Sequence, residues 1–173
     1  MGKLPRIYVG EMKSPIGMLT IACMDEGVCY VAFGPITEIE WKIKKWADKH
    51  LVYDAIVRDT ERTAEPIQQL QEYFVGERRT FTVPLSLKGT PFQKQVWQAL
   101  QSIEYGETCS YKDIAEAIGN PKAVRAVGSS NGKNPVSIFI PCHRVIGSNG
   151  GLVGYGGGLN NKKILLGLEQ EFY

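Results

Sequence analysis

A cysteine and a histidine stand side by side late in the chain, at Cys142 and His143. Cysteine reacts as its thiolate, so a nucleophilic cysteine needs a neighbouring group that removes its proton. A histidine, with an ordinary pKa of about 6.5, suits that task. The β-branched and aromatic residues 136–140 predict a strand before the pair, and the glycine-dense residues 147–158 predict a loop after it. We therefore expect a nucleophilic thiol at the end of a strand.

An acidic residue that orients the histidine would complete this relay. Neighbours in an extended chain point to opposite faces, so contact between Cys142 and His143 requires a local turn or a bridging water. Glu169, on a helix predicted from about Asn160, is the first candidate for the acid, and Glu171 is the second. The alternative is a buried thiol beside a hydrogen-bonded core histidine, which leaves the flanking proline, arginine and glycines unexplained.

Length and composition indicate a globular protein of one domain or two small ones, with 173 residues of which 43% are apolar. We find no secretory leader and no apolar run near the roughly 20 residues that span a bilayer, so we expect a cytoplasmic protein without membrane contact. Four cysteines without a Cys-x-x-Cys pair, and only two histidines, predict reduced thiols. We expect neither a metal nor a cofactor.

Charge is distributed unevenly between the halves, with a net −1 for residues 1–85 and +3 for residues 86–173. The basic surplus therefore accompanies the Cys-His pair. Such an imbalance favours a polyanionic partner only weakly, because it is small.

The first half predicts a small antiparallel meander followed by helices. Turn signals at Ser14-Pro15-Ile16-Gly17 and Asp25-Glu26-Gly27 separate its alternating segments. The expected elements are strands 6–12, 18–24 and 28–33, a helix 37–50, a strand 51–57, and a second helix capped by Thr63. Cys23 and Cys29 are expected in the core and His50 at a helix end. We place the domain boundary between residues 76 and 88, which gives domains 1–85 and 86–173.

The second half predicts mostly helices. Thr90-Pro91-Phe92-Gln93 has the form of a capping box, with Trp97 on the core side of the helix that follows. Ser110-Tyr111-Lys112-Asp113 is a second capping signature, and it opens another helix, which runs through Ile118 and stops at Gly119. Asn120-Pro121 restarts the chain as a helix to about Ser130. This is the form of a helix-turn-helix, although many such pairs never touch DNA.

Small side chains line one side of the second of these helices, at Ala123, Ala126, Gly128 and Ser129, and Arg125 projects from its middle. A thin helix can enter a narrow groove, and an inserted side chain can fill the place of an extruded base. The alternative is that the small residues serve close helix packing.

The segment Pro141-Cys142-His143-Arg144-Val145 resembles the active-site motif of the O6-alkylguanine-DNA alkyltransferases, also called methylated-DNA–protein-cysteine methyltransferases. The resemblance covers nearly all of residues 86–173, and it extends to Thr90–Gln93, Ser110–Tyr111, Arg125–Gly128, Asn134–Pro135, Tyr155–Leu159 and the helix ending at Glu169. It implies an α+β fold. A ribonuclease H-like domain with an antiparallel sheet and helices would precede a mostly helical domain with a winged helix-turn-helix.

The resemblance also implies a role for each matched residue in the reaction. Cys142 would accept the alkyl group from O6 of a flipped guanine. His143 would act as the base through a water, and Glu169 would orient it. Asn134 would tie the helix-turn-helix to the active-site segment, and Tyr111 would hydrogen-bond the flipped nucleotide.

The implied partner is duplex DNA that contains O6-alkylguanine, bound in its minor groove by a monomer. Arg125 would replace the extruded base, with Ala123, Ala126, Gly128 and Ser129 beside it. The backbone of Cys142 and Val145 would accept from the exocyclic amine. Tyr155 would contribute to the substrate site, and the amide of Gly156 would face O6. O4 of alkylated thymine is a further expected target.

The sequence departs from some family members in three ways. The first half lacks the histidines with which some members bind zinc. Ser137 stands where some relatives have proline, and Gly156 where some have serine, so acceptance of bulky adducts is open. Relatives that lost transfer activity carry tryptophan in place of the cysteine, and Cys142 argues against that class.

Two other functions compete with the transferase. A non-catalytic DNA-binding module that recognises alkylated bases and recruits repair factors shares the helix-turn-helix and Arg125, but not the need for Cys142. A hydrolytic cysteine enzyme leaves the helix-turn-helix unexplained. A thioether is a poor leaving group, so a transferase should act once per molecule. The cations expected at DNA phosphates are Lys112, Lys122, Arg125, Lys133 and Arg144.

Overall fold

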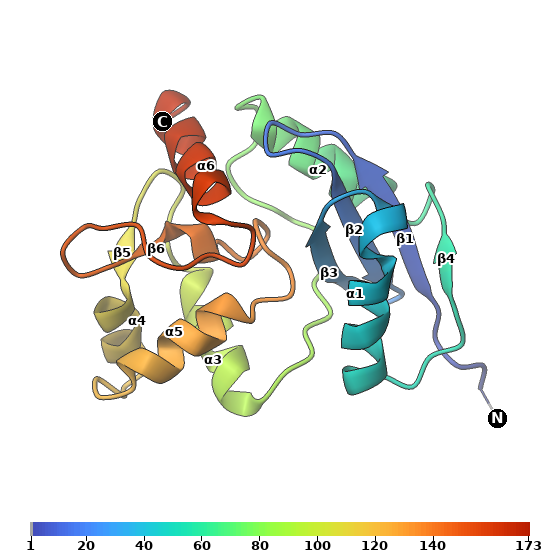
Figure 1. Ribbon diagram of the computed structural model, residues 1–173, viewed down its shortest axis with the longest axis horizontal. Helices are drawn as coiled ribbons and strands as arrows, with labels where there is room; N and C mark the ends of the chain where they lie inside the picture. The colour runs from blue at the N-terminus through green and yellow to red at the C-terminus, as the bar shows by residue number, and fades with distance from the viewer. Residues whose placement is uncertain (1) are drawn as a thin grey trace. The chain divides into compact units, whose positions relative to one another are not determined.

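The computed structural model describes residues 2–173 and divides into two compact units, Met1–Lys88 and Gly89–Tyr173. The division falls at the end of the segment 76–88, in which the sequence placed the domain boundary. Each unit has its own arrangement of helices and strands (Figure 1).

The N-terminal unit is built on a four-stranded sheet in the order β3-β2-β1-β4. Strands β1 (Ile7–Met12), β2 (Leu19–Met24) and β3 (Gly27–Phe33) form the expected antiparallel meander. Strand β4 (Ile56–Arg58) pairs parallel to β1. The expected strand 51–57 is wrong over its first part, because the strand begins only at Ile56; Leu51 and Tyr53 instead pack against the core.

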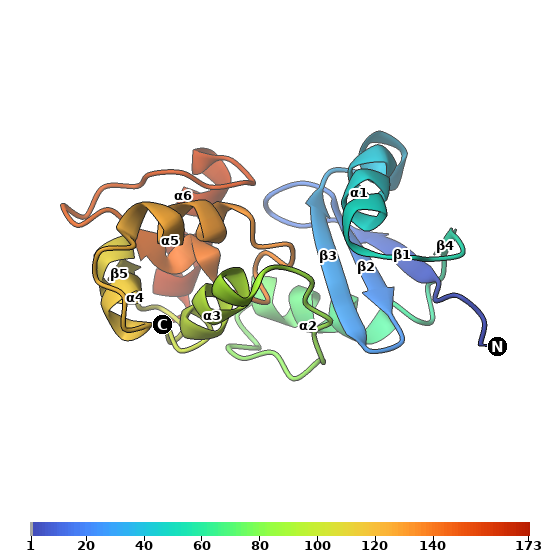
Figure 2. The same cartoon turned by 90° about the horizontal axis from the view of Figure 1, so that it is seen from below.

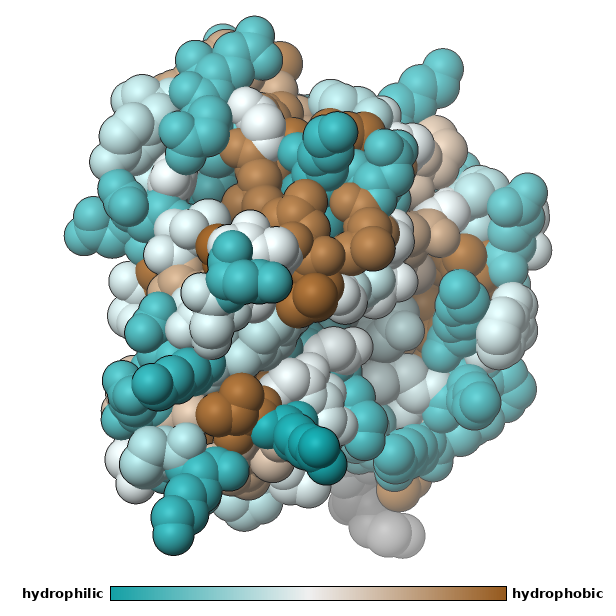
Figure 3. All heavy atoms as spheres, turned by 60° about the vertical axis from the view of Figure 1, so that its left-hand side comes forward, coloured by the Kyte–Doolittle hydropathy of each residue, from teal (hydrophilic) through white to brown (hydrophobic). Residues whose placement is uncertain are grey.

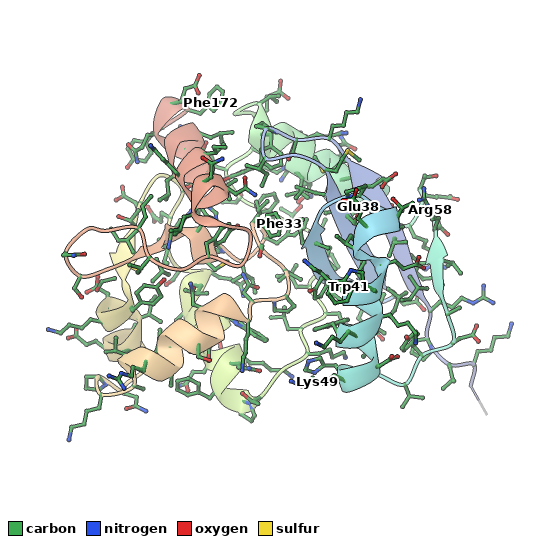
Figure 4. The ribbon with its side chains drawn as sticks, in the orientation of Figure 1. Phe33, Glu38, Trp41, Lys49, Arg58 and Phe172 are labelled. Carbon is green, nitrogen blue, oxygen red and sulfur yellow. The ribbon has the colours of Figure 1, made fainter. Side chains whose placement is uncertain are left out.

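Helices cover the two faces of this sheet (Figures 1 and 2), with α1 (Ile36–His50) on one and α2 (Ala64–Phe74) on the other. Helix α1 buries Ile39 and Ile43 against the sheet. Along the same helix, Figure 4 shows Glu38, Trp41 and Lys49, and Trp41 is 60% exposed.

We expect Thr63 to cap α2 with its side chain, and this expectation is wrong. Thr63 directly precedes α2, but its side chain makes no cap bond; its hydroxyl donates to the carbonyl of Asp59 at 2.8 Å. Asp59 serves the preceding turn, since its carboxylate accepts from the amides of Glu61 and Arg62.

The cysteines of the N-terminal unit lie in its core. Cys23 and Cys29 are free and buried, and burial raises both pKa values, that of Cys23 to about 12. Such thiols are inert at neutral pH. His50 ends α1 and packs against the ring of Trp46, with 5.5 Å between ring centroids. Within residues 2–173, no three His, Cys, Asp or Glu side chains gather as a metal site would require.

The C-terminal unit contains four α-helices and one short parallel strand pair. They are α3 (Pro91–Leu100), β5 (Cys109–Ser110), α4 (Tyr111–Ala117), α5 (Val124–Gly132), β6 (Val145–Ile146) and α6 (Leu159–Glu171). Both expected capping boxes are confirmed. Thr90 exchanges side-chain and backbone bonds with Gln93, and Ser110 does so with Asp113. Gly119 follows the end of α4 with φ of 77°, a conformation that favours glycine.

Two expected elements of this unit are wrong. Helix α5 begins at Val124 rather than at Asn120, because residues 120–123 form a turn in which the amide of Ala123 donates to the carbonyl of Asn120 at 3.0 Å. Residues 136–140 form a turn rather than a strand. The amide of Ile140 bonds the carbonyl of Val136 at 3.1 Å, and Ile138 takes φ of 78°, which a β-branched residue adopts only where its surroundings impose it.

No helix within residues 2–173 combines the length and apolarity that a bilayer crossing needs. On the face turned forward in Figure 3, hydrophilic residues surround a smaller hydrophobic area.

Candidate active site

The Cys142 thiol sits in a tightly turned segment rather than at a strand end. Pro141 has φ of −81° and ψ of 62°, and the amide of Cys142 bonds the carbonyl of Ile140 at 2.8 Å, which is an inverse γ-turn. A 3₁₀ helix, η1 (Cys142–Arg144), follows directly. Asn134 fixes the turn from the end of α5, because its Nδ2 donates to the same Ile140 carbonyl at 2.8 Å.

His143 is held by a buried acid from α6. Its Nε2 lies 2.5 Å from Oε2 of Glu169, and the exposed fractions of the two side chains are 0% and 1%. Oε1 of Glu169 accepts from the amide of Gly106 at 3.0 Å and from Nε of Arg144 at 2.8 Å. Glu171, the other candidate acid, is exposed at the end of the helix.

Electrostatics keep this acid ionised and the histidine neutral. Burial acts to raise the pKa of Glu169, but hydrogen bonds and charges from His143 and Arg144 outweigh it and lower that pKa from 4.5 to about 2. Burial lowers the pKa of His143 despite the opposing influence of Glu169. His143 is therefore an unprotonated base at neutral pH, with its ring fixed by a carboxylate.

The thiol itself is buried, with 3% of Cys142 exposed. Burial raises its pKa, while hydrogen bonding to Asn134 and Ser137 and the charge of Lys162 act in the opposite direction. The Sγ atom lies 3.9 Å from the hydroxyl oxygen of Ser137. Cys142 is thus protonated at rest, and it needs a base before it can act as a nucleophile.

Tyr111 is the first residue of α4, directly after its cap Ser110. Its hydroxyl donates to the carbonyl of Val153, in the glycine-dense loop, at 2.9 Å. Burial raises the pKa of that hydroxyl, so it is a hydrogen-bond donor at neutral pH. A Cβ added to Gly128 of α5 would lie 3.9 Å from the Tyr111 ring, which shows how closely the two helices approach.

The small residues of α5 lie partly in solvent. Arg125, Ala126 and Ser129 are exposed or half-exposed along the helix, whereas Ala123 and Gly128 are half-buried. The inner side of the helix packs on α3, where Nε1 of Trp97 donates to the carbonyl of Ser130 at 2.8 Å. The structure therefore gives α5 a thin, exposed face with one arginine, and it confirms Trp97 as a core residue.

The remaining expected substrate residues flank the turn that holds the thiol. Val145 is buried and pairs with Cys109 in the short sheet. Tyr155 is half-buried, and burial raises the pKa of its hydroxyl well above the ordinary value. Gly156 is exposed, and a Cβ added there would come no closer than 3.7 Å to the carbonyl oxygen of Gly132. That distance is an ordinary contact, so the backbone does not demand glycine there.

Sequence reasoning missed Lys162 of α6, which is fully buried. Its Nζ donates to the carbonyls of Val145, Val153 and Gly154 at 2.5, 3.0 and 3.2 Å, so one ammonium joins the active-site strand to the glycine-dense loop. A signal was present. Lys162 shares helical spacing with Leu165 and Glu169, which places it on the buried face.

Sequence reasoning also assigned Arg144 wrongly to DNA phosphates. The side chain is 7% exposed and its guanidinium is committed to Glu169 and to the carbonyl of Ile103, the latter at 2.6 Å. A guanidinium that neutralises a buried carboxylate is not available to a polyanion.

Comparison with known proteins gives a consistent result for both units. Residues 7–87 match the family model described as the ribonuclease-like domain of 6-O-methylguanine DNA methyltransferase, and residues 91–171 match the model of its DNA binding domain. The constitutive methylated-DNA–protein-cysteine methyltransferase of Bacillus subtilis is 47% identical over 167 residues, which cover 96% of this chain and 97% of that protein. The methylated-DNA–protein-cysteine methyltransferase of Methanosarcina acetivorans is 47% identical over 94% of this chain and 98% of its own.

Solved structures agree with this assignment. The crystal structure of Mycobacterium tuberculosis O6-methylguanine methyltransferase matches with a TM-score of 0.80 and 40% identity, over 96% of this chain and 94% of that one. The structure of the same organism's OGT in complex with DNA matches with a TM-score of 0.81, 41% identity and the same coverage. The chain, with its Cys-His-Glu site in the part that matches the DNA-binding model, therefore belongs to the 6-O-methylguanine DNA methyltransferase family.

Proposed function

We propose that this protein repairs DNA by transferring a methyl or other alkyl group from O6 of guanine in a duplex to Sγ of its own Cys142, once per molecule. Membership of the family and the names of the relatives support this activity. The observation that carries it is a buried thiol directly before a histidine that a buried, ionised Glu169 orients.

The reaction is an in-line displacement at the alkyl carbon. His143 takes the thiol proton through a water, and because Glu169 engages Nε2, the exchange falls to Nδ1. The thiolate attacks the alkyl carbon, a C–S bond forms, and the C–O bond breaks with its electron pair going to O6. A thioether is a poor leaving group, so the alkylated protein is the end product.

The base must leave the stack before the thiol can reach it. Arg125, exposed on α5, fills the vacated position from the minor groove, with Ala123, Ala126, Gly128 and Ser129 close to the DNA backbone. The Tyr111 hydroxyl bonds the flipped base and offsets the charge that develops on it. The carbonyls of Cys142 and Val145 accept hydrogen bonds from the exocyclic amine, and the amide of Gly156 faces O6. Tyr155 lines the same site. Asn134 keeps the thiol in place.

The proposal also covers the oligomeric state of the protein, its compartment and a second target base. The protein acts as a monomer on duplex DNA in the cytoplasm, and O4 of alkylated thymine is a second target. Four free cysteines, none paired in a disulfide within residues 2–173, fit a reducing compartment. The C-terminal unit, residues 86–173 in the sequence prediction, carries both DNA binding and the acceptor thiol.

Mass spectrometry tests this function directly. A duplex oligonucleotide with one O6-methylguanine should add one methyl group to the peptide that contains Cys142, and the yield should stop at one per protein. Cys142→Ala should abolish transfer and still bind the duplex. Absence of an adduct, or many turnovers per protein, contradicts the proposal. Full binding without any adduct in the wild-type protein would favour the non-catalytic module instead.

A further inference from the structure

Asn131, in the last turn of α5, carries a polar side chain that the proposed reaction does not yet use. The residue is 3% exposed. Its Nδ2 donates to the carbonyl oxygen of Cys142 at 3.4 Å, and its Oδ1 has no hydrogen-bond partner within residues 2–173. A buried acceptor without a donor is costly and uncommon, so it calls for a physical explanation.

The amide reaches a second reacting group, the hydroxyl of Tyr111. Hydrogen bonding by the Asn131 side chain acts to lower the pKa of Tyr111, against the larger effect of burial. One side chain therefore bonds the carbonyl of Cys142 and also acts on the pKa of the Tyr111 hydroxyl. The proposed function gives these two groups to the flipped guanine, the carbonyl to its exocyclic amine and the hydroxyl to the base.

The orientation of this amide follows from its neighbours. Exchanging the oxygen and nitrogen of Asn131 would bring two acceptors together at the Cys142 carbonyl, so Nδ2 must face that carbonyl. The carbonyl also accepts from the amide of Val145, and the bond of 3.4 Å from Asn131 is long. A long bond is weak, and it can give way to an amine that arrives with the substrate.

The chain next to Asn131 is anchored by hydrogen bonds in the core. The neighbouring carbonyl of Ser130 is held by Nε1 of the buried Trp97 at 2.8 Å. Three residues later, Asn134 holds the carbonyl of Ile140 in the same way that Asn131 holds that of Cys142. The end of α5 thus fixes two alternate carbonyls of the segment that carries the thiol.

We propose that Asn131 is a positioning residue for methyl transfer, which aligns the Cys142 carbonyl and the Tyr111 hydroxyl with the two edges of the flipped guanine. This inference rests on the proposed function. In the bound state one hydrogen of the exocyclic amine replaces Nδ2 at the Cys142 carbonyl, and the second hydrogen, directed at the Val145 carbonyl, is shared with Oδ1 of Asn131. The orphaned oxygen of the free protein is the group that the substrate satisfies.

The test compares two duplexes that differ only in the exocyclic amine, one with O6-methylguanine and one with O6-methylhypoxanthine. Asn131→Leu keeps the size of the side chain and removes both of its polar atoms. With O6-methylguanine, the single-turnover rate of methyl transfer should fall about tenfold, the size expected for one lost buried hydrogen bond. With O6-methylhypoxanthine, the loss should shrink to about twofold or less, because no amine is present to be aligned.

A double-mutant cycle with Tyr111→Phe tests the second contact. If Asn131 acts through the hydroxyl, Asn131→Leu should cost less in the Tyr111→Phe protein than in the wild type. An unchanged rate for Asn131→Leu overturns the inference. The inference is also overturned if Asn131→Leu lowers the transfer rate equally on both duplexes and its effect is additive with that of Tyr111→Phe. That result would indicate a general structural defect.

Gln69→Met is the matched control. Gln69 is also a buried amide at 3% exposure, but it bonds Thr82 in the N-terminal unit. This variant should lower the melting temperature without distinguishing the two duplexes. If Asn131→Leu does not fold, Asn131→Ala and Asn131→Ser carry the same comparison. A wild-type protein that transfers no methyl group would refute the proposed function, whereas a wild-type that transfers at the same rate as Asn131→Leu would refute only the role of Asn131.

Discussion

Glu169 connects three parts of the candidate site through hydrogen bonds to its carboxylate. Its carboxylate accepts from His143, from the part-buried amide of Gly106 and twice from Arg144. A buried carboxylate is tolerated only when it is paired in this way. The consequence is a histidine that stays neutral and is fixed in orientation beside a protonated thiol.

The rate of methyl transfer should therefore depend on pH through His143. Burial lowers the pKa of His143 below its ordinary 6.5, so the base is lost only when the pH falls below that value. We expect the acid limb of the single-turnover rate to have its midpoint below 6.5. A midpoint above the ordinary value would mean that Glu169 raises the pKa of the histidine more than burial lowers it.

Stability should fall in acid through the same residues. The folded-state pKa of Glu169 is about 2, against 4.5 for the ordinary group, so the unfolded chain binds more protons and stability is lost as the pH falls from 4.5 towards 2. The contribution is about 3 kcal/mol at most. Urea unfolding across this window should show the loss, and Glu169→Gln, already less stable at neutral pH, should show a smaller further decline.

Lys162 should matter for both stability and transfer. Lys162→Met removes the donor of three carbonyls, of which that of Val145 is buried, and this should cost about 3 kcal/mol of unfolding free energy. Transfer should slow as well, because the glycine-dense loop loses its link to Val145. Lys163→Met, at the exposed neighbour, is the control and should change stability by less than about 0.5 kcal/mol. Equal behaviour of the two variants would remove Lys162 from the site.

At the scale of elements, helix starts place the functional groups. Helix α4 begins at Tyr111 because Ser110 and Asp113 form a capping box, and α3 begins at Pro91 because Thr90 and Gln93 form another. The first box sits against the proposed base pocket, whereas the second starts a helix whose Val96 and Trp97 fill the core. The same local chemistry thus serves different purposes.

Removing each cap separates these purposes. Thr90→Ala and Ser110→Ala should each cost about 1 kcal/mol of stability, measured by thermal unfolding. Only Ser110→Ala should also slow methyl transfer, because it frees the first turn that carries Tyr111. Similar transfer rates for the two variants would show that the position of Tyr111 does not depend on its cap.

At the scale of the whole molecule, the cations available to DNA are few. Of the cations expected at phosphates, Lys112, Lys122, Arg125 and Lys133 are exposed, and Arg144 is withdrawn by its ion pair with Glu169. So small a set of phosphate contacts implies only a moderate, salt-sensitive affinity.

A plot of log affinity against log salt concentration should therefore have a slope no steeper than about −4. Lys133→Gln should reduce that slope by about 1, and Lys42→Gln, on α1 of the N-terminal unit, should leave it unchanged. Fluorescence anisotropy on an undamaged duplex gives both slopes. An affinity that does not change with salt would contradict phosphate binding by these residues.

The sequence by itself determined the elements whose cause is local. The capping boxes, the glycine that follows α4, the antiparallel meander and the buried side of α3 depend on turn chemistry and periodicity, which neighbouring residues carry. The motif around Cys142 likewise indicated the chemistry and the family. The sequence also proposed Glu169 as the acid, but spacing alone did not separate it from Glu171.

Tertiary structure decided what depends on partners far along the chain. Residues 136–140 have the composition of a strand, yet Asn134 and the packing around the buried Ile138 hold them in a turn. Arg144 looked like a phosphate ligand until Glu169, 25 residues away, took its charge. The sequence identified Cys142 as the nucleophile because a thiol beside a histidine is a local pattern. The pKa of the thiol, the orientation of His143 and the residues around both depend on the folded chain.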